Sequence, residues 1–548
     1  MSKTRSQRFL RDNLPTAVWV LVFAVAPLLF GFLSVQFGKD NNWDLRNYHY
    51  YNAYAFLNHR LDLDIAPAQL QTYYNPLLDL PFYYMSRHFP ARLVGWMLGF
   101  AHGFNFSLVF LITWLVLKIE KPANRCWLAL GSSIVAVIAP GFLSVLGNTM
   151  NDDIVSLFVL GALALILAAQ KAPAGRRGAR TGWPLVAAGL LLGAILGLKL
   201  TAATYGLSAA IAVAAVAPSW TDRWRRILSL AAGSVAGALA TAGFWWLDIY
   251  LRFGNPFFPY FNNIFRSPFA SPEAWRDTSL GPRSVWEYLV WPLWFSLDGL
   301  RVNKTRLSDI RFGLLYVLAL AAIVWAVVHF LQRRKDDSPL PGPRLFERPL
   351  GDLVLVFFAS SYVFWVLFFP QYRYLIPLEL LVPLCFLLTL DRLPISSRLA
   401  IGVACIAALP VFVLFKPPDW GRLPWSDPYI SVNTGNLHLR EDGLVVMLGQ
   451  SPMSYVIPSF PGGYRFIHPE SNLLPAADKF QLSRQIHAEL QEYKSAVYVL
   501  YDAGNPAFNL EDSLSRLGLY DLRKCLPLET RVHDRLELCL ASVYRSTQ

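Results

Sequence analysis

The chain has 548 residues, of which 54% are hydrophobic and only 16% are charged, and its mean hydropathy is +0.36. Ordinary soluble domains carry about one-quarter charged residues, so this composition excludes a soluble protein and indicates an integral membrane protein. The formal net charge is +12, but the Lys and Arg residues stand in short clusters between apolar runs. They are interpreted as orientation signals, and a nucleic-acid partner is excluded.

The chain opens with a basic N-terminus (residues 3–11) and an apolar run from Thr16 to Val35. This run is too long for a signal-peptide core and has no small-residue cleavage site, so it predicts an uncleaved helix whose N-terminus is cytoplasmic. Ten further runs of roughly 17 to 25 apolar residues predict membrane helices, at 92–117, 126–147, 153–170, 183–198, 201–217, 227–250, 313–331, 350–370, 374–390 and 398–416.

About eleven helices, an odd number, place the C-terminus on the side opposite the N-terminus. The predicted inner loops agree, because each contains Lys and Arg residues, as at 118–125, 171–180, 223–226, 333–348 and 392–398. The outer loop 251–312 is also basic. Long loops obey the positive-inside rule weakly, so its cations could instead serve an anionic ligand.

A polar stretch fills the first outer loop, residues 36–91, directly after the first helix. Within it, 44–58 and 76–88 have apolar residues at helical spacing and predict two helices that lie in the membrane interface. Asp44 follows the end of a membrane helix among amides and tyrosines, where a carboxylate is costly unless it has a function. Asp44 is therefore the leading candidate for the chemistry, with helix N-capping as the alternative interpretation.

Residues 417–548 have a different pattern. Buried strands are predicted at 443–448, 495–501 and 536–544, and amphipathic helices at 479–493 and 510–517. In an oxidising compartment Cys525 and Cys539 could form a disulfide. The predicted fold is mostly α, with a polytopic helix bundle at 1–416 and a small extracytoplasmic α/β domain at 417–548.

The predicted topology brings five charged residues to one membrane face, namely Asp44, Asp152, Asp153, Lys199 and Arg373. This set suits a phosphate-bearing lipid, because cations can hold the phosphate while carboxylates handle protons or a metal at the reacting carbon. Each residue also has a structural interpretation. The two neighbouring aspartates suit a helix N-terminus, and the two cations could simply contact lipid headgroups.

Other polar residues of the first loop are interpreted more simply. Asp40, Asp62 and Asp64 are taken as solvated loop charges. His49 and His59 are taken as residues of a polar helix face, because no His/Cys cluster with metal-ligand spacing accompanies them. The chain also lacks a Walker A loop, a dinucleotide-binding glycine motif and a nucleophile elbow, which argues against nucleotide-driven transport and serine hydrolysis.

Several segments together resemble the GT-C superfamily of membrane glycosyltransferases, through their order and sidedness. They are Asp44–Tyr48, Gln71–Leu77, Asn151–Asp153, Gly254–Pro259, Arg373–Pro377 and the outer C-terminal domain. The resemblance implies a polyprenyl-phosphate sugar donor, with Asp44 as general base or acceptor-positioning residue and Asp152 or Asp153 assisting. Family members often have a paired acidic motif in the first loop, whereas three residues separate Asp40 from Asp44 here.

We therefore expect transfer of a sugar to a lipid, glycan or protein acceptor, with inversion at the anomeric carbon. Asp44 would take the acceptor proton, and Lys199 and Arg373 would stabilise the departing phosphate. Further substrate-binding residues are expected at Arg46, Tyr48, Asn75 and Tyr372. No cofactor is required by the sequence; a divalent cation, bound by Asp44 and Asp153, is left open. The expected location is a bacterial inner membrane, with the C-terminal domain in the periplasm.

Three alternatives remain at this stage. A flippase or transporter for lipid-linked sugars would share the phosphate-binding cations but needs polar residues at mid-membrane depth and matching halves, which the apolar runs do not show. An oligosaccharide ligase, which transfers a whole glycan, fits the same residues. A non-catalytic membrane scaffold is disfavoured by the polar first loop.

Overall fold

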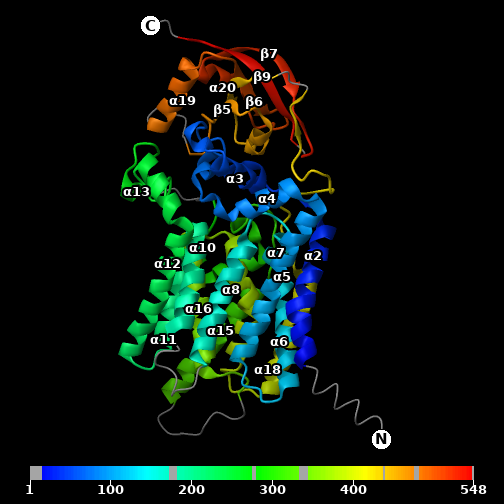
Figure 1. The fold of residues 1–548 in the computed structure, drawn as a ribbon. Helices are drawn as coiled ribbons and strands as arrows, with labels where there is room; N and C mark the ends of the chain where they lie inside the picture. The colour runs from blue at the N-terminus through cyan, green and yellow to red at the C-terminus, as the bar shows by residue number, and fades with distance from the viewer. Residues whose placement is uncertain are drawn as a thin grey trace.

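The computed structural model describes residues 15–171, 182–273, 279–332, 344–435, 439–473, 480–532 and 534–545. The predicted basic N-terminus and the inner-loop cations at 176–180 and 333–335 lie outside these ranges. A long helix bundle forms one part of the molecule and a smaller domain containing a sheet covers one end of it (Figure 1). The predicted class, a mostly α polytopic bundle with a C-terminal α/β domain, is confirmed.

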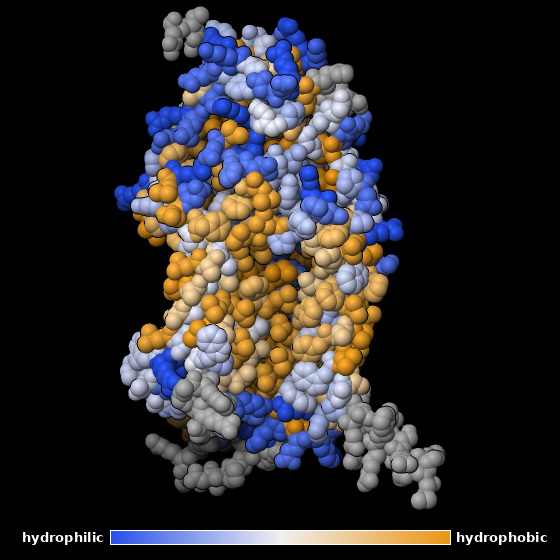
Figure 2. Space-filling model, in the orientation of Figure 1, coloured by the Kyte–Doolittle hydropathy of each residue, from blue (hydrophilic) through white to orange (hydrophobic). Residues whose placement is uncertain are grey.

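Within the described residues, eight helices are long and apolar enough to cross a membrane. The first runs from Pro15 to Phe37 and ends with α2 (Ala26–Phe37). The others are α5 (Ala91–Val116), α8 (Asp152–Gln170), α12 (Trp220–Phe253), α15 (Arg311–Gln332), α16 (Arg348–Phe368), α17 (Ile376–Leu390) and α18 (Ser397–Leu414). On the face in view, Figure 2 shows apolar surface along the bundle and polar surface at both of its ends, which is the pattern of a membrane protein.

Three shorter helices complete the bundle: α6 (Pro122–Val137), α10 (Gly182–Leu198) and α11 (Ala203–Ala215). Every predicted membrane helix thus has a helical counterpart, but the prediction of one helix at 126–147 was wrong. The chain leaves the helical path after α6 and forms the short α7 (Pro140–Ser144). Pro140 has no N–H for a continuing helix, and proline also disfavours helical backbone in the residue before it.

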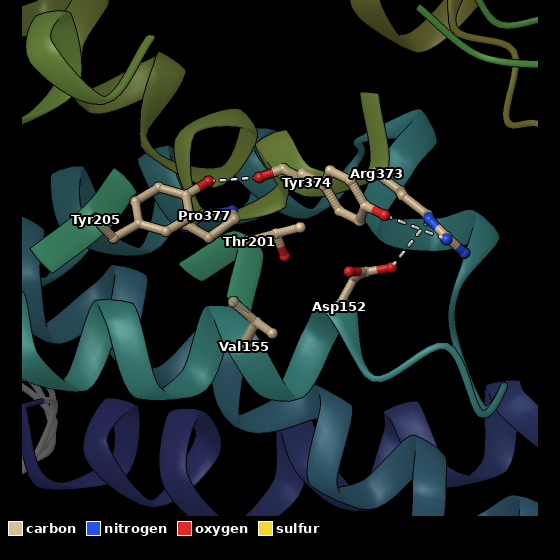
Figure 3. Close-up of a pocket in the computed structure, with 7 residues that line it drawn as sticks. All are labelled: Asp152, Val155, Thr201, Tyr205, Arg373, Tyr374 and Pro377. Atoms are coloured by element: carbon tan, nitrogen blue, oxygen red, sulfur yellow. Dashed lines mark hydrogen bonds and ion pairs between the residues drawn. The ribbon is translucent and has the colours of Figure 1, made fainter. Parts of the chain in front are cut away.

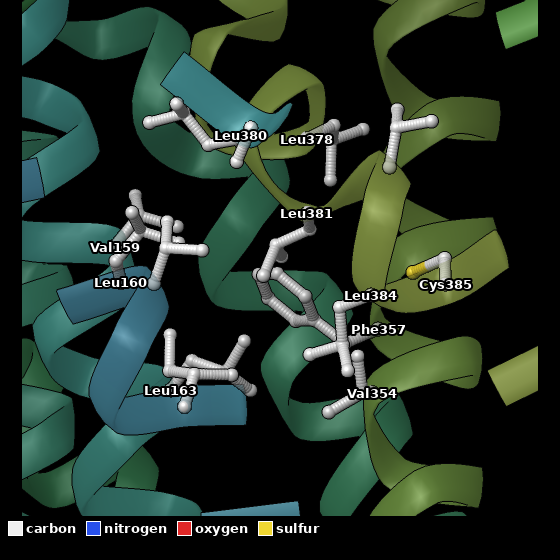
Figure 4. Close-up of a cluster of buried hydrophobic side chains, with 14 of the residues drawn as sticks. Val159, Leu160, Leu163, Val354, Phe357, Leu378, Leu380, Leu381, Leu384 and Cys385 are labelled. Carbon is white, nitrogen blue, oxygen red and sulfur yellow. The ribbon is translucent and has the colours of Figure 1, made fainter. Parts of the chain in front are cut away.

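Small residues and aliphatic side chains pack the bundle. Where α10 meets α12, a Cβ atom added at Gly193 would lie only 1.9 Å from the Ser234 carbonyl oxygen. Small residues of this kind allow two membrane helices to approach closely. Elsewhere, buried side chains of α8, α16 and α17 interlock, among them Leu163, Phe357 and Leu384 (Figure 4).

The first outer loop folds into short elements between the bundle and the α/β domain (Figure 1). They are β1 (Lys39–Asp40), η2 (Leu45–His49), α3 (Tyr50–Leu57), η3 (Arg60–Asp62), η4 (Gln69–Tyr73), η5 (Pro76–Leu78) and α4 (Leu80–His88). The predicted interfacial position is wrong for α3. Tyr51 and Ala55 are buried in one apolar cluster with Tyr455 and Val456 of the C-terminal domain, which replaces lipid as their environment.

The second outer loop also contains helices, α13 (Asn262–Phe265), α14 (Val285–Leu297) and η8 (Gly299–Arg301). Short turns lead into two bundle helices: η7 (Leu200–Ala202) precedes α11, and η9 (Tyr372–Leu375) precedes α17. Both turns lie at the end of the bundle that faces the α/β domain. η9 contacts α7 there, and η7 follows α10 at the same end. Arg373 lies in η9, and Lys199 directly precedes η7.

The α/β domain contains a five-stranded sheet in the order β5-β4-β6-β9-β7. Its strands are β4 (Asp442–Met447), β5 (Gly463–Ile467), β6 (Val497–Asp502), β7 (Leu519–Pro527) and β9 (Leu536–Val543). β4 is parallel to β5 and β6, and β9 is antiparallel to β6 and β7. The helices are α19 (Gln481–Glu492) and α20 (Leu510–Leu517). A disulfide joins Cys525 of β7 to Cys539 of β9, the two cysteines paired from the sequence.

Two smaller strand pairs connect the parts of the chain. β1 pairs with β2 (Arg422–Leu423), which ties the start of the first outer loop to the segment after α18. β3 (Val432–Asn433) pairs with β8 (Glu529–Thr530). The segment Ser454–Ser459 forms η11, which contacts η2 and α3. The C-terminal domain is therefore fastened directly onto the loop that contains Asp44.

Candidate functional site

Asp44 is buried at the start of η2 and contacts Arg373 of η9. Its side chain makes no N-capping hydrogen bond, so the capping interpretation does not apply. Instead, its Oδ2 accepts a hydrogen bond of 2.5 Å from an Arg373 Nη atom. The η2 turn is a π-helix. This form is rare in proteins overall, and where it occurs it is often found at functional sites.

Arg373 also approaches a second carboxylate. Its Nε lies 3.6 Å from Oδ2 of Asp152, the first residue of α8 (Figure 3). The other oxygen of Asp152 accepts from Lys199, which follows α10 and also donates to the Met150 carbonyl at 2.9 Å. Asp44, Arg373, Asp152 and Lys199 thus alternate in charge from four separate segments. We call these four residues the ion network.

A small pocket borders the ion network. It is lined by Asp152, Val155, Thr201, Tyr205, Arg373, Tyr374 and Pro377 (Figure 3). The Tyr374 ring faces both cations, at 5.3 Å from Arg373 Cζ and 5.5 Å from Lys199 Nζ, which is cation–π distance. The pocket therefore combines one cation, Arg373, and one carboxylate, Asp152, with apolar side chains at one mouth of the bundle.

The charge state of Asp44 follows from its neighbours. Burial raises the pKa of Asp44 and is the largest single effect, but the charge and hydrogen bond of Arg373, together with contributions from His49 and Lys199, outweigh it. The pKa therefore lies below the ordinary value of 3.8, and Asp44 is ionised at neutral pH. Tyr48 lies beside it and stays protonated, because burial and the charge of Asp44 raise its pKa well above 10.0.

Sequence reasoning missed one pair at this site. His49 Nδ1 lies 2.6 Å from Oδ1 of Asp79, and both side chains are buried. Asn151 donates to the same oxygen at 3.3 Å. The interpretation of His49 as a residue of a polar helix face was therefore wrong. The available signal was Asp79 itself, a single carboxyl group in the apolar segment Leu77–Pro81.

Asp153 and Arg46 have partners outside the ion network. Asp153 Oδ2 lies 3.3 Å from Nδ1 of His102 in α5. Arg46 forms an ion pair with Asp534 of the C-terminal domain, which fastens that domain to η2. Both residues thus lie near the site in sequence but face other elements.

Asn75 and Tyr372 are also engaged elsewhere. Asn75 Nδ2 donates to the carbonyl oxygens of Gly197 and Thr241 at 3.0 and 2.9 Å, which ties the first loop to α10 and α12. The Tyr372 hydroxyl contacts Asp309 and Glu379 at 2.6 and 2.9 Å. Tyr372 directly precedes Arg373, so its contacts can hold that arginine in place.

The Tyr372 contacts belong to a larger buried network. Arg311 bridges Asp309 and Glu379, with nitrogen–oxygen distances of 2.6 and 3.1 Å. Glu379 in turn accepts hydrogen bonds from the Gly141 and Phe142 amides of α7 at 2.9 and 2.8 Å. Arg311 therefore faces both carboxyl groups, and the network joins α7, α15 and α17 around η9.

Two loop carboxylates that were predicted to be solvated are buried. Asp40 accepts hydrogen bonds from the Thr149 amide and hydroxyl, both at 2.8 Å. Asp64 pairs with Arg60 at 2.5 Å and accepts from the Tyr51 hydroxyl at 2.9 Å. The prediction failed because these acids fasten the first loop to the structures around it, so solvent is excluded. The hydrogen bonds to Asp40 come from Asn42 and Thr149, so this carboxylate ties the first loop to the segment before α8.

Three cations at the ends and middle of the outer loop 251–312 have acidic partners. Arg252 pairs with Asp62, Arg301 pairs with Glu287, and Arg311 pairs with Asp309. Within the described ranges, no three His, Cys, Asp or Glu side chains gather as metal ligands. Asp44 and Asp153, the pair considered for a cation, face Arg373 and His102 respectively.

The fold and the ion network define a polytopic membrane protein with a buried polar site at one mouth of its helix bundle. No family model and no curated protein matches the chain. The structure is similar to that of ArnT from Cupriavidus metallidurans bound to undecaprenyl phosphate, with 13% identity, coverage of 97% of this chain and 99% of that chain, and a TM-score of 0.49.

It is also similar to the archaeal oligosaccharyltransferase AglB from Archaeoglobus fulgidus in complex with an inhibitory peptide and a dolichol-phosphate. Here the identity is 13%, the coverage is 90% of this chain and 70% of that chain, and the TM-score is 0.41. Both proteins are GT-C membrane glycosyltransferases, the superfamily that the sequence resembles. With TM-scores below 0.5, this likeness decides nothing about the site, and the function proposed below depends on the site's own contacts.

Proposed function

We propose that this chain is a membrane glycosyltransferase that moves a sugar from a polyprenyl phosphate to an acceptor hydroxyl. One observation carries the proposal: Asp44 and Asp152 hold Arg373 and Lys199 together beside a pocket at the bundle mouth. A lipid phosphate at the membrane surface needs such cations, and a hydroxyl nucleophile needs such a carboxylate.

The ion network offers the phosphate a ready place. Arg373 presents a planar fork of donors that suits phosphate oxygens, and Lys199 adds a compact charge. The phosphate would replace the Asp44 carboxylate as a partner of Arg373, while Asp152 stays in contact with both cations. Asp44 would then lose its hydrogen bond from Arg373, and its carboxylate would become free to accept a proton.

The transfer is a single displacement reaction at the anomeric carbon of the sugar. The acceptor oxygen attacks the anomeric carbon from the face opposite the phosphate, so the configuration inverts. The bond from that carbon to the phosphate oxygen breaks, and its electron pair remains on the phosphate beside Arg373 and Lys199. The hydroxyl proton passes to Asp44. Asp152 keeps both cations positioned throughout, since it contacts each of them.

We place this reaction on the extracytoplasmic face of a bacterial inner membrane, with the α/β domain in the periplasm and the acceptor a lipid, a glycan or a protein. The inner-loop cations at 118–125 and 223–226 support this orientation. The α/β domain covers the loop that holds Asp44, and it could bring an acceptor to the site from outside the bilayer.

The test uses the full chain in proteoliposomes with radiolabelled polyprenyl-phosphate sugars and a bacterial envelope extract as acceptor. A new glycosidic bond, detected as label transferred to the acceptor, supports the proposal. Movement of the labelled lipid between leaflets without a new bond would contradict it and support a flippase. Transfer of a whole glycan, with no transfer of single sugars, would support an oligosaccharide ligase instead.

A further inference from the structure

His49 and Asp79 form a second acid–base group next to Asp44. The two side chains are 4% and 3% exposed, and their contact of 2.6 Å joins Nδ1 to a carboxylate oxygen. Asn151, which directly precedes Asp152, donates to the same oxygen. The pair is thus held by the first outer loop and by the start of α8, the two elements that supply the carboxylates of the ion network.

The other ring nitrogen of this histidine, Nε2 of His49, is buried and left without a hydrogen-bond partner among the described residues, as are the ring nitrogens of His102 in α5. By contrast, the buried His468 of the α/β domain has its two ring nitrogens 3.3 and 2.8 Å from the carbonyl oxygens of Pro67 and Gly449. An unsatisfied buried polar atom is costly, so it calls for an explanation such as a functional role.

His49 and Asp44 lie at the two ends of η2. They are five positions apart, and π-helical hydrogen bonds also span five positions, so both stand on one side of the turn. When His49 is protonated, its charge is, after that of Arg373, the next largest that lowers the pKa of Asp44. The other groups that face the pair are Lys199 and Tyr48, whose ring centroid is 4.1 Å from that of His49.

The ion network also explains why a second proton acceptor is useful. Asp44 is a weak base even after Arg373 has turned to the phosphate, because an unperturbed aspartate has a pKa of about 4. A proton taken from a hydroxyl would not remain on it for long. Imidazole is the side chain that exchanges protons between about pH 5 and 8, and an aspartate at one nitrogen stabilises its protonated form.

We propose that His49 Nε2 receives the acceptor proton from Asp44, and that Asp79 is the residue that positions the ring for this step. This inference rests on the proposed function. The O–H bond of the acceptor breaks as the glycosidic bond forms, and the proton goes first to the Asp44 carboxylate. It then forms the N–H bond at Nε2, and the imidazolium is paired with Asp79. After the product leaves, the proton passes to water.

The first test is the pH profile of kcat, measured with whichever polyprenyl-phosphate sugar the transfer assay turns over. His49→Gln should lower kcat by about 100-fold or more and remove the acid limb near neutral pH, because general acid–base groups contribute on this scale. Asp79→Asn should keep that limb but move it to lower pH, since the imidazolium loses its anionic partner. His88→Gln, at an exposed histidine of α4, is the matched control.

An unchanged shape of the pH profile in His49→Gln would overturn the inference, whatever the rate, because a purely structural role lowers activity equally at every pH. If His88→Gln also removed the acid limb near neutral pH, the inference would be overturned too.

A second test does not need the donor. Imidazole ¹⁵N NMR of the full chain in nanodiscs, assigned by the signal lost in His49→Gln, should show a neutral tautomer with the proton on Nδ1 and Nε2 bare. Asp79→Asn should lower the midpoint of its titration. A proton fixed on Nε2, or an unchanged midpoint, would overturn the inference even if sugar transfer is found. The expected tautomer without transfer of any donor would instead contradict the proposed function, and the catalytic role of His49 with it.

Discussion

Arg373 and Asp44 meet across 329 positions of sequence, in a hydrogen bond of 2.5 Å between the turn before α17 and the turn after the first membrane helix. Both side chains are largely buried, with 12% and 11% of their surface exposed. A buried ion pair of this kind costs desolvation energy and is weak evidence for stability alone. Its position beside a pocket and a second carboxylate is what points to a function.

Asp44→Asn should lower sugar transfer by about 100-fold to 10,000-fold, because the amide keeps the shape of the side chain but accepts no proton. The assay is transfer from the radiolabelled donor in proteoliposomes. Asp62→Asn is the control: this residue lies in the same loop and pairs with Arg252, but its side chain is 61% exposed. Turnover near that of the unmodified chain in Asp44→Asn would remove Asp44 from the reaction.

Arg373→Lys should weaken the binding of undecaprenyl phosphate by about tenfold, or about 1.4 kcal/mol, because one ammonium cannot replace the planar fork that reaches two carboxylates. Affinity can be measured by titrating the lipid into the chain in detergent. Arg392→Lys offers a matched comparison, since Arg392 pairs with Asp352 at the opposite end of α17. Equal affinities of the two variants would speak against a phosphate site at Arg373.

The contribution of Asp44 to the free energy of unfolding should be lost at acid pH. The pKa of Asp44 is lowered in the folded chain, so its ionised form contributes stability that is complete above the ordinary value of 3.8 and is lost as pH falls through the folded value. The difference in Tm between the unmodified chain and Asp44→Asn should stay constant from about pH 7 to 5 and change only under more acid conditions. A difference that varies across neutral pH would be inconsistent with this.

Tyr372→Phe should destabilise the fold by about 1–3 kcal/mol, because the lost hydroxyl contacts two buried carboxylates. It should also weaken lipid-phosphate binding, since Tyr372 holds the turn that carries Arg373. Thermal unfolding and lipid titration measure the two effects. Tyr84→Phe removes a hydroxyl from a side chain that is 59% exposed, and should change neither. If Tyr372→Phe changed neither thermal unfolding nor lipid binding, the network around Arg311 would have no role in positioning Arg373.

Much of the bundle could be predicted because lipid imposes a simple rule: each apolar run of membrane length forms a helix. The loop charges then indicate which helix ends lie on the same membrane face. This reasoning correctly predicted that four residues meet at one mouth of the bundle, namely Asp44, Asp152, Lys199 and Arg373. The break after α6 was harder to foresee, because the run 126–147 stays apolar through Pro140 and hydropathy alone does not register a change of direction.

The sequence pattern does not tell which side chains pair with each other, because it does not record the direction in which each side chain points. Successive residues of a helix point about 100° apart, so only one of Asp152 and Asp153 can face the cations, and hydropathy does not say which. His49 and Asp79 meet because the chain between them folds back through three short helical turns. Arg46 was expected to bind substrate but meets Asp534, because the docking of the α/β domain leaves no periodic signal.

The most direct test of the phosphate site is a cryo-electron microscopy structure of the full chain with undecaprenyl phosphate. We expect the phosphorus to lie between Lys199 and Arg373, with the hydrogen bond from Arg373 to Asp44 opened and the Asp44 carboxylate facing the pocket. A phosphate bound elsewhere, with Arg373 still on Asp44, would contradict the account.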